Sequence, residues 1–87
     1  MKYIALLHQD AGSGIGVLFV DFPGVVAFGK TLTEAHRMAH QALRAHLANL
    51  RVLGRRLPEP STLAEVCKSV DYEDALTLML VEVSESA

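Results

Sequence analysis

Two histidines at helical spacing are the first residues of this sequence that could carry chemistry. His36 and His40 are four residues apart in a segment of helical periodicity, a spacing that can place two imidazoles on one metal ion. A catalytic zinc site of this type also needs a glutamate beside the first histidine and a third ligand, whereas Arg37 follows His36 here. The favoured interpretation is structural: His36 and His46 pack in the apolar stripe of the helix as hydrogen-bonded side chains, and His40 lies at its rim.

Glycines, carboxylates and one cysteine offer three weaker candidates. Residues 12–16 carry glycine at alternate positions, as phosphate-binding loops do, but no helix is predicted to follow, so a flexible hairpin tip is favoured. Asp10, Asp21 and Glu34 could act as the metal-binding carboxylates of a nuclease, although the first two lie in predicted turns and Glu34 serves a helix cap. Cys67 has no evident base and is predicted to be an inert, partly buried thiol. The sequence therefore predicts no catalytic residue, no metal site and no cofactor, and a protein that is not an enzyme.

The elements that position these residues begin with three short apolar runs. Residues 2–8 and 15–20 are separated by turn residues and are predicted to form a hairpin. Residues 21–24, Asp-Phe-Pro-Gly, are predicted to break the second strand, because proline lacks a backbone donor and glycine tolerates a turn. A third strand is predicted over residues 25–28.

A long helix is the clearest local prediction. Thr31 and Glu34 have capping-box spacing, and apolar residues then recur every three or four positions to residue 50. The helix is predicted over residues 32–53, with Gly54 as its left-handed stop. Thr62 and Glu65 repeat the capping-box spacing before a short helical turn that runs through Val66.

The last part of the chain completes the predicted fold. Residues 70–74 are predicted to be a polar loop, and residues 76–83 a final strand. The fold class is therefore α+β: a small, mainly antiparallel sheet in the order β-β-β-α-β, with one long helix packed on one face.

Length and charge restrict the class of protein further. The chain has 87 residues, which suffices for one small core, so residues 1–87 are predicted to be a single domain. The absence of a long apolar run or a signal-like start, together with a lone cysteine, predicts a cytoplasmic protein that does not enter a membrane. Residues 1–58 carry a net charge of +4 and residues 59–87 a net charge of −6. The acidic part could attract a basic partner, although a solvated acidic face is the simpler interpretation of charge alone.

Both faces of the predicted sheet are largely apolar, and this leads from fold to function. Alternate residues of the first strand place Tyr3 and Leu7 on one face and Ile4 and Leu6 on the other. A sheet with one solvated face should instead alternate apolar and polar residues. One long helix covers one face only, so the other must be covered by the short helix, a second copy or a different protein. An external partner is favoured because the short helix is small.

Several motifs, taken together, resemble HicB-type antitoxins. They are MKYIALLH at residues 1–8, GVLFVDFPG at 16–24, GKTLTEA at 29–35, LxxHL at 43–47 and GxxLPxPS at 54–61. The resemblance extends over nearly the whole chain. Val20 stands where a proline is usual before Asp-Phe-Pro-Gly, and Lys30 replaces a commonly acidic residue; both departures concern turn and surface detail.

The resemblance implies a truncated ribonuclease H-like fold and an antitoxin of a type II toxin–antitoxin pair. Such a protein masks the catalytic histidine of a small, basic, mRNA-cleaving toxin of the HicA type. Family members usually continue into a DNA-binding segment, and residues 1–87 are expected to hold none, so that this chain alone does not bind nucleic acid.

The predicted partner-contact residues are Asp21, Phe22, Pro23 and Gly24, which are expected to project from a tight turn. The alternative for this segment is a structural turn whose phenylalanine caps the core. The alternative function is a homo-oligomeric structural or regulatory domain without a toxin, and self-association is expected in either case. A residual ribonuclease H-like nuclease is the third possibility.

Overall fold

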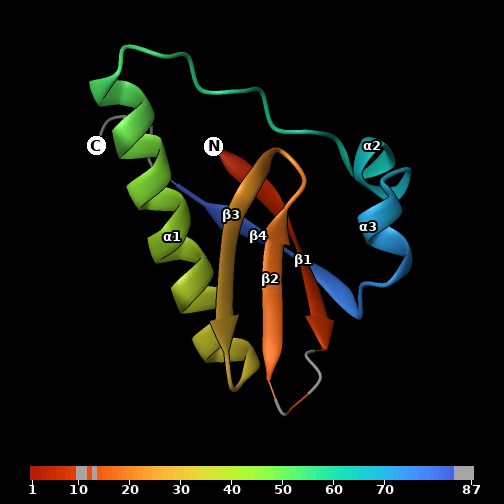
Figure 1. The fold of residues 1–87 in the computed structure, drawn as a ribbon. Coiled ribbons are helices and arrows are strands. Elements are labelled where there is room, and N and C mark those ends of the chain that lie inside the picture. The colour runs from red at the N-terminus through yellow and green to blue at the C-terminus, as the bar shows by residue number, and fades with distance from the viewer. Residues whose placement is uncertain (10–11, 13, 84–87) are drawn as a thin grey trace.

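The sheet has four strands in the order β3-β2-β1-β4, and every neighbouring pair is antiparallel (Figure 1). The computed structural model describes residues 1–9, 12 and 14–83. Its elements are β1 (Lys2–Gln9), β2 (Ile15–Phe19), β3 (Phe22–Gly29), α1 (Leu32–Val52), α2 (Leu63–Cys67), α3 (Val70–Glu73) and β4 (Thr77–Glu82). The predicted α+β class, the order of the four strands and the long helix along the chain, and the antiparallel sheet are confirmed.

Local signals set both ends of α1. The hydroxyl of Thr31 accepts the N–H of Glu34 at 3.1 Å. The Glu34 carboxylate accepts the N–H of Lys30 at 2.8 Å, one residue earlier than a capping box requires. At the other end Gly54 has a φ of +72°, and the N–H of Arg55 donates to the carbonyl of Leu50 at 2.9 Å. The predicted glycine stop is confirmed as a Schellman motif.

The segment expected to break the second strand belongs instead to β3. The turn lies at Val20 and Asp21, and Phe22 pairs with Phe19 as β3 begins. The register then shifts, so that Leu18 pairs with Val26, and Gly24 has a φ of +98° within this irregularity. Pro23 is tolerated because β3 is an edge strand, where a missing N–H need not break the ladder.

The main core lies between α1 and one face of the sheet, called here the inner face. Buried alanines and leucines at every fourth position of α1 pack against it: Ala35, Ala39, Leu43 and Leu47. Tyr3 is fully buried in this core, and its hydroxyl donates to the carbonyl of Pro58 at 2.6 Å. This bond fixes the linker that leads from α1 to α2 across the top of Figure 1.

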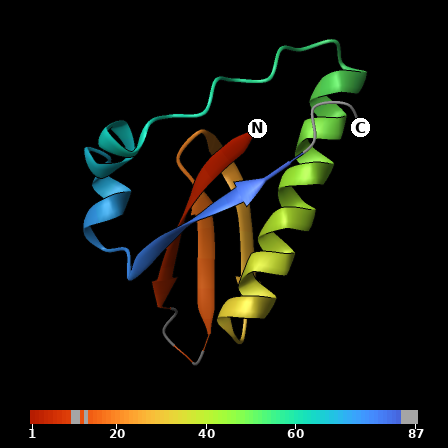
Figure 2. The same ribbon diagram turned by 180° about the vertical axis from the view of Figure 1, so that it is seen from behind.

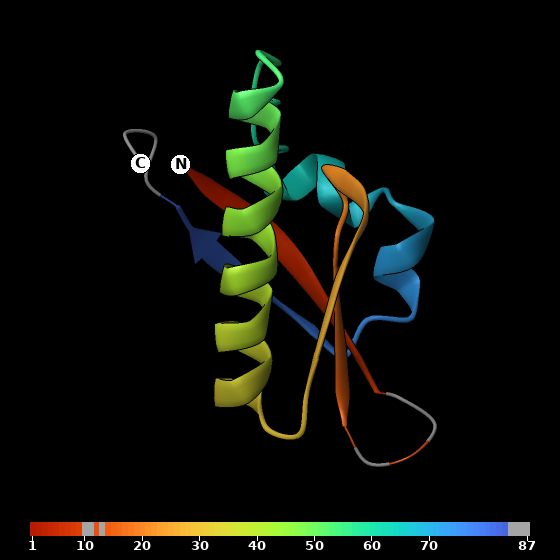
Figure 3. The same ribbon diagram turned by 60° about the vertical axis from the view of Figure 1, so that its left-hand side comes forward.

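The short helices lie on the opposite, outer face of the sheet (Figure 3). The capping box of Thr62 and Glu65 is present in both directions and starts α2, whose Val66 is buried against Ile4 and Leu6. The prediction of a loop over residues 70–74 was wrong, because the Ser69 hydroxyl accepts the N–H of Asp71 at 3.2 Å and caps α3. Among the described helices, none is both long and apolar enough to cross a membrane.

Candidate partner-binding surface

The histidines of α1 lie apart from any metal-binding cluster. His36 is exposed, so its expected packing in the apolar stripe was wrong, while His40 is half-buried at the rim as expected. His46 packs edge-to-face on Phe22 with ring centroids 5.4 Å apart, which confirms its packed role. Within residues 1–9, 12 and 14–83, no three His, Cys, Asp or Glu side chains could hold one metal ion.

The glycine-rich turn has a packing explanation. Asp10 and residue 13 lie outside the described residues, and so does much of the expected flexible tip. After Gly14 the chain enters β2, not a helix. A Cβ at Gly14 would lie 2.2 Å from Cζ of Phe28, so the missing side chain makes room for this ring.

Two of the four residues in the predicted contact segment, residues 21–24, make contacts within the protein, and the other two are exposed. The Asp21 carboxylate accepts the backbone N–H of Ser61 at 3.0 Å and also the Ser61 hydroxyl. Phe22 is only 4 % exposed and lies edge-on to Tyr3, with centroids 4.8 Å apart. The expectation that Phe22 projects was therefore wrong, whereas Pro23 and Gly24 are exposed. A contact role for the segment stays a prediction.

The outer face is only partly covered, and one uncovered region lies at the β3 edge. This β3 patch consists of Leu18, Val26 and Phe28 beside a hollow of about 570 Å³ that His8 also lines. Val26 is 66 % exposed and Phe28 48 %. All eight residues of β3 are uncharged, although edge strands are usually protected by charges. Such a patch is typical of a surface that another chain covers.

His8, which lines the same hollow, has one ring nitrogen without a hydrogen-bond partner among the described residues. The Nε2 of His8 lies 3.0 Å from the carbonyl oxygen of Asp71. A carbonyl only accepts, so Nε2 is the donor of this hydrogen bond. Nδ1 is buried and has no hydrogen-bond partner among the described residues.

A second uncovered region lies along β4. This β4 flank consists of Tyr72, Glu73, Leu76, Leu80 and Glu82, and the first three line a hollow of about 640 Å³ together with Cys67. The Tyr72 hydroxyl donates a hydrogen bond to the sulfur of Cys67, and this bond raises the pKa of Tyr72. The β4 flank combines large apolar side chains with carboxylates.

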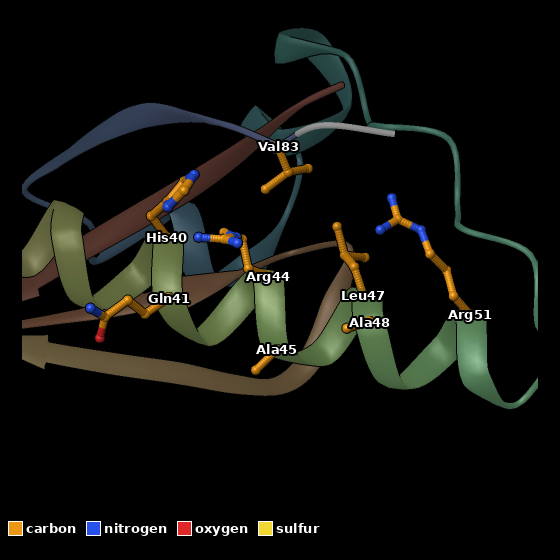
Figure 4. Close-up of a pocket in the computed structure, with 8 residues that line it drawn as sticks. All are labelled: His40, Gln41, Arg44, Ala45, Leu47, Ala48, Arg51 and Val83. Carbon is orange, nitrogen blue, oxygen red and sulfur yellow. The ribbon is translucent and has the colours of Figure 1, made fainter. Parts of the chain in front are cut away.

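The long helix presents the opposite charge. A hollow of about 530 Å³ lies between α1 and the end of β4, and its lining includes His40, Arg44, Arg51 and Val83 (Figure 4). In contrast, residues 59–82 carry six exposed carboxylates against one cation, Lys68. The molecule therefore has a basic helix side and an acidic α2–α3 side.

These features define a small α+β binding domain: a sheet with one face closed by a helix and the other left partly open. Over residues 3–87 the chain matches the family described as "HicB_like antitoxin of bacterial toxin-antitoxin system". The chain belongs to this HicB-like antitoxin family.

Solved structures of antitoxins share this fold. The N-terminal domain of Burkholderia pseudomallei antitoxin HicB aligns with a TM-score of 0.79 and 28 % identity, over 97 % of this chain and 99 % of that one. The Burkholderia pseudomallei antitoxin HicB aligns with a TM-score of 0.85 and 32 % identity, over 99 % of this chain but 65 % of that one.

A toxin–antitoxin complex from Streptococcus pneumoniae contains a similar chain, with a TM-score of 0.76 and 24 % identity over 99 % of this chain and 70 % of that one, which shows the shared fold. No curated protein matches this sequence.

Proposed function

We propose that this chain neutralises a small mRNA-cleaving toxin of the HicA type by binding it and covering its active site. Family membership supports the antitoxin role, and a structure described as a HicA3 and HicB3 toxin–antitoxin complex contains the same fold. The observation that carries the proposal is the outer face, where α2 buries Ile4 and Leu6 but leaves large apolar side chains exposed on both sides. Exposed apolar area of this kind favours a bound protein.

The proposed mechanism is occlusion without chemistry. An antitoxin that excludes RNA from the toxin needs steric bulk and a surface that competes with phosphate for a basic site. The exposed carboxylates of residues 65–82 supply negative charge, which accelerates the approach of a basic protein; this attraction weakens with added salt. This chain is proposed to act in the cytoplasm, where mRNA is cleaved, as a single domain that does not itself bind nucleic acid.

Self-association is proposed as a second property. The uncharged β3 edge with exposed Val26 and Phe28 favours a second copy as the cover of the β3 patch. If the chain has no toxin partner, this surface supports the alternative function of a homo-oligomeric regulatory domain. Light scattering on the purified chain, compared with Val26→Lys, measures this directly: the dimer should be lost in the variant.

An RNA-cleavage assay tests the toxin proposal. A HicA-type toxin, sought in the gene next to the one for this chain, is mixed with an mRNA and rising amounts of the purified chain. Cleavage should stop near stoichiometric addition, and inhibition should weaken as salt rises. Undiminished cleavage at excess chain would refute the proposal.

A further inference from the structure

The open edge of β4 carries the strongest further inference. Met1 and Val83 exchange two backbone hydrogen bonds, each of 2.8 Å. In an antiparallel ladder such pairs alternate with pairs that make no bonds to each other, so Leu78, Leu80 and Glu82 direct their N–H and C=O groups away from β1. Within the described residues, the one side-chain bond recorded to these groups is from the Thr77 hydroxyl to the Leu78 carbonyl, at 3.5 Å.

Space for another strand lies beside this edge. In Figure 2, β4 crosses the sheet nearest the viewer, and α1 stands to its right. Two hollows lie between β4 and α1: the one that Arg44 lines, and another of about 420 Å³ lined by Leu7, Leu32 and Met79. Of the apolar residues that line these hollows, Leu32 is 60 % exposed and Met79 is half-buried, and a fifth strand beside β4 would cover them.

The opposite edge is a poorer acceptor of a strand. β3 contains Pro23, which offers no N–H. The helix α1 also lies beside β3 in the views of both Figure 1 and Figure 3. β4 contains no proline and packs less extensively against α1, and its Leu80 is 53 % exposed.

Charge indicates the kind of strand that fits. Glu82 lies on β4 itself, and Glu73 lies where α3 leads into β4. A residue opposite Glu82 on an added strand would have its Cβ about 5 Å from that of Glu82, where a cation is stabilised and a carboxylate is not. A second copy would place no cation there, because the described residues of β4 include none.

We propose that the free edge of β4 binds an extended segment of the toxin, which adds a fifth strand to the sheet. This segment has apolar side chains towards the groove between β4 and α1, and Lys or Arg opposite Glu82. The inference depends on the proposed function for the identity of the partner, and it adds the place and the mode of binding.

Residue-resolved amide exchange tests the mode of binding. In the free chain, the N–H groups of Leu78, Leu80 and Glu82 should exchange fast, while those of Met79 and Val81, bonded to β1, exchange slowly. Addition of the adjacent gene's toxin should slow the three fast amides at least tenfold. If the toxin is inhibited but these amides stay fast, the β4 inference is overturned and the proposed function stands.

Slow exchange of these amides in the free chain, together with a dimeric mass, would instead make a second copy the occupant and also overturn the inference. Failure of the chain to inhibit the toxin at all refutes the proposed function, whatever the exchange pattern is.

Two matched pairs of variants give an independent readout. Leu80→Pro removes an open-edge N–H that makes no bond to β1, and Leu80→Ala removes the side chain but keeps that N–H. Toxin affinity should fall at least tenfold more in the proline variant, since a partner carbonyl is left unpaired. Glu82→Lys should weaken binding about tenfold, whereas Glu59→Lys, in the linker, should have less than a twofold effect.

Circular dichroism confirms that each variant folds. Should Leu80→Pro unfold, the exchange pattern of the unmodified chain and the Glu82 and Glu59 pair still decide the outcome. Equal effects of the two charge reversals would contradict a contact at β4.

Discussion

Replacement of Phe22 separates a core role from a contact role for the Asp-Phe-Pro-Gly segment. Phe22 is buried against Tyr3, Phe19 and His46, with ring centroids between 4.8 and 6.4 Å apart. Phe22→Ala should lower the free energy of unfolding by about 3–5 kcal/mol, the usual cost of deleting a buried ring. A domain of this size has a total of about 4–13 kcal/mol, so the loss is a large fraction of its stability.

Urea denaturation followed by circular dichroism measures the loss. With a slope of about 1 kcal/mol per molar urea, the midpoint should fall by about 3 M or more, and the variant can be partly unfolded in buffer. Pro23→Ala is the matched control: Pro23 is adjacent but exposed, so its free energy of unfolding should change by less than about 0.5 kcal/mol.

Toxin inhibition by the same variants completes the test. We retain Pro23 and Gly24 as proposed contacts, so Pro23→Ala should weaken inhibition without loss of stability. Phe22→Ala should inhibit in proportion to its folded fraction. The core assignment would be refuted if Phe22→Ala kept the original urea midpoint and yet lost all inhibition.

Three further predictions concern single interactions. Asp21→Ala should lower the free energy of unfolding by about 1–3 kcal/mol, because the Ser61 N–H loses its charged acceptor; an unchanged urea midpoint would contradict this. Gly54→Ala should lower the free energy of unfolding by about 1 kcal/mol and the Tm by about 5 °C. A Cβ at this position would meet no other atom, so the loss comes from the φ of +72°, which is strained for alanine; an unchanged Tm would contradict this reason. Hydrogen bonds from the backbone and hydroxyl of Thr62 lower the pKa of Glu65. The stability that the ionised Glu65 adds to α2 is therefore fully present above the ordinary carboxyl pKa, and it is lost as the pH falls through the lowered pKa. The protection factors of the α2 amides, which compare the observed exchange rate with the intrinsic rate at each pH, should therefore fall in acid, and Glu65→Gln should remove that dependence; an equal fall in both proteins would contradict it.

The boundaries of the helices were readable from the sequence because caps are local. Thr31, Gly54 and Thr62 act on backbone groups within a few residues of themselves, so their spacing alone predicted where α1 and α2 begin and where α1 ends. The Ser69 cap was equally local but was overlooked in a polar segment, and α3 was missed for that reason.

The start of β3 was misplaced because the rule that proline breaks strands depends on non-local position. Pro23 is compatible with a strand at the edge of a sheet and incompatible with one at its centre. The sequence order of the strands does not state which of them is at the edge. Only the pairing β3-β2-β1-β4 decided it.

The candidate partner-binding surface was also predicted from the sequence only in part. Alternation along the strands was enough to predict two apolar faces, since successive side chains of a strand point to opposite sides. The position of α2 decided which residues stay exposed, because it places Val66 over Ile4 and Leu6 and leaves Val26 and Leu80 to solvent. Phe22 and His46 are 24 residues apart in sequence, and only the fold brings their rings into contact. Residue type and spacing fix periodicity and caps, whereas exposure depends on contacts between segments that are distant along the chain.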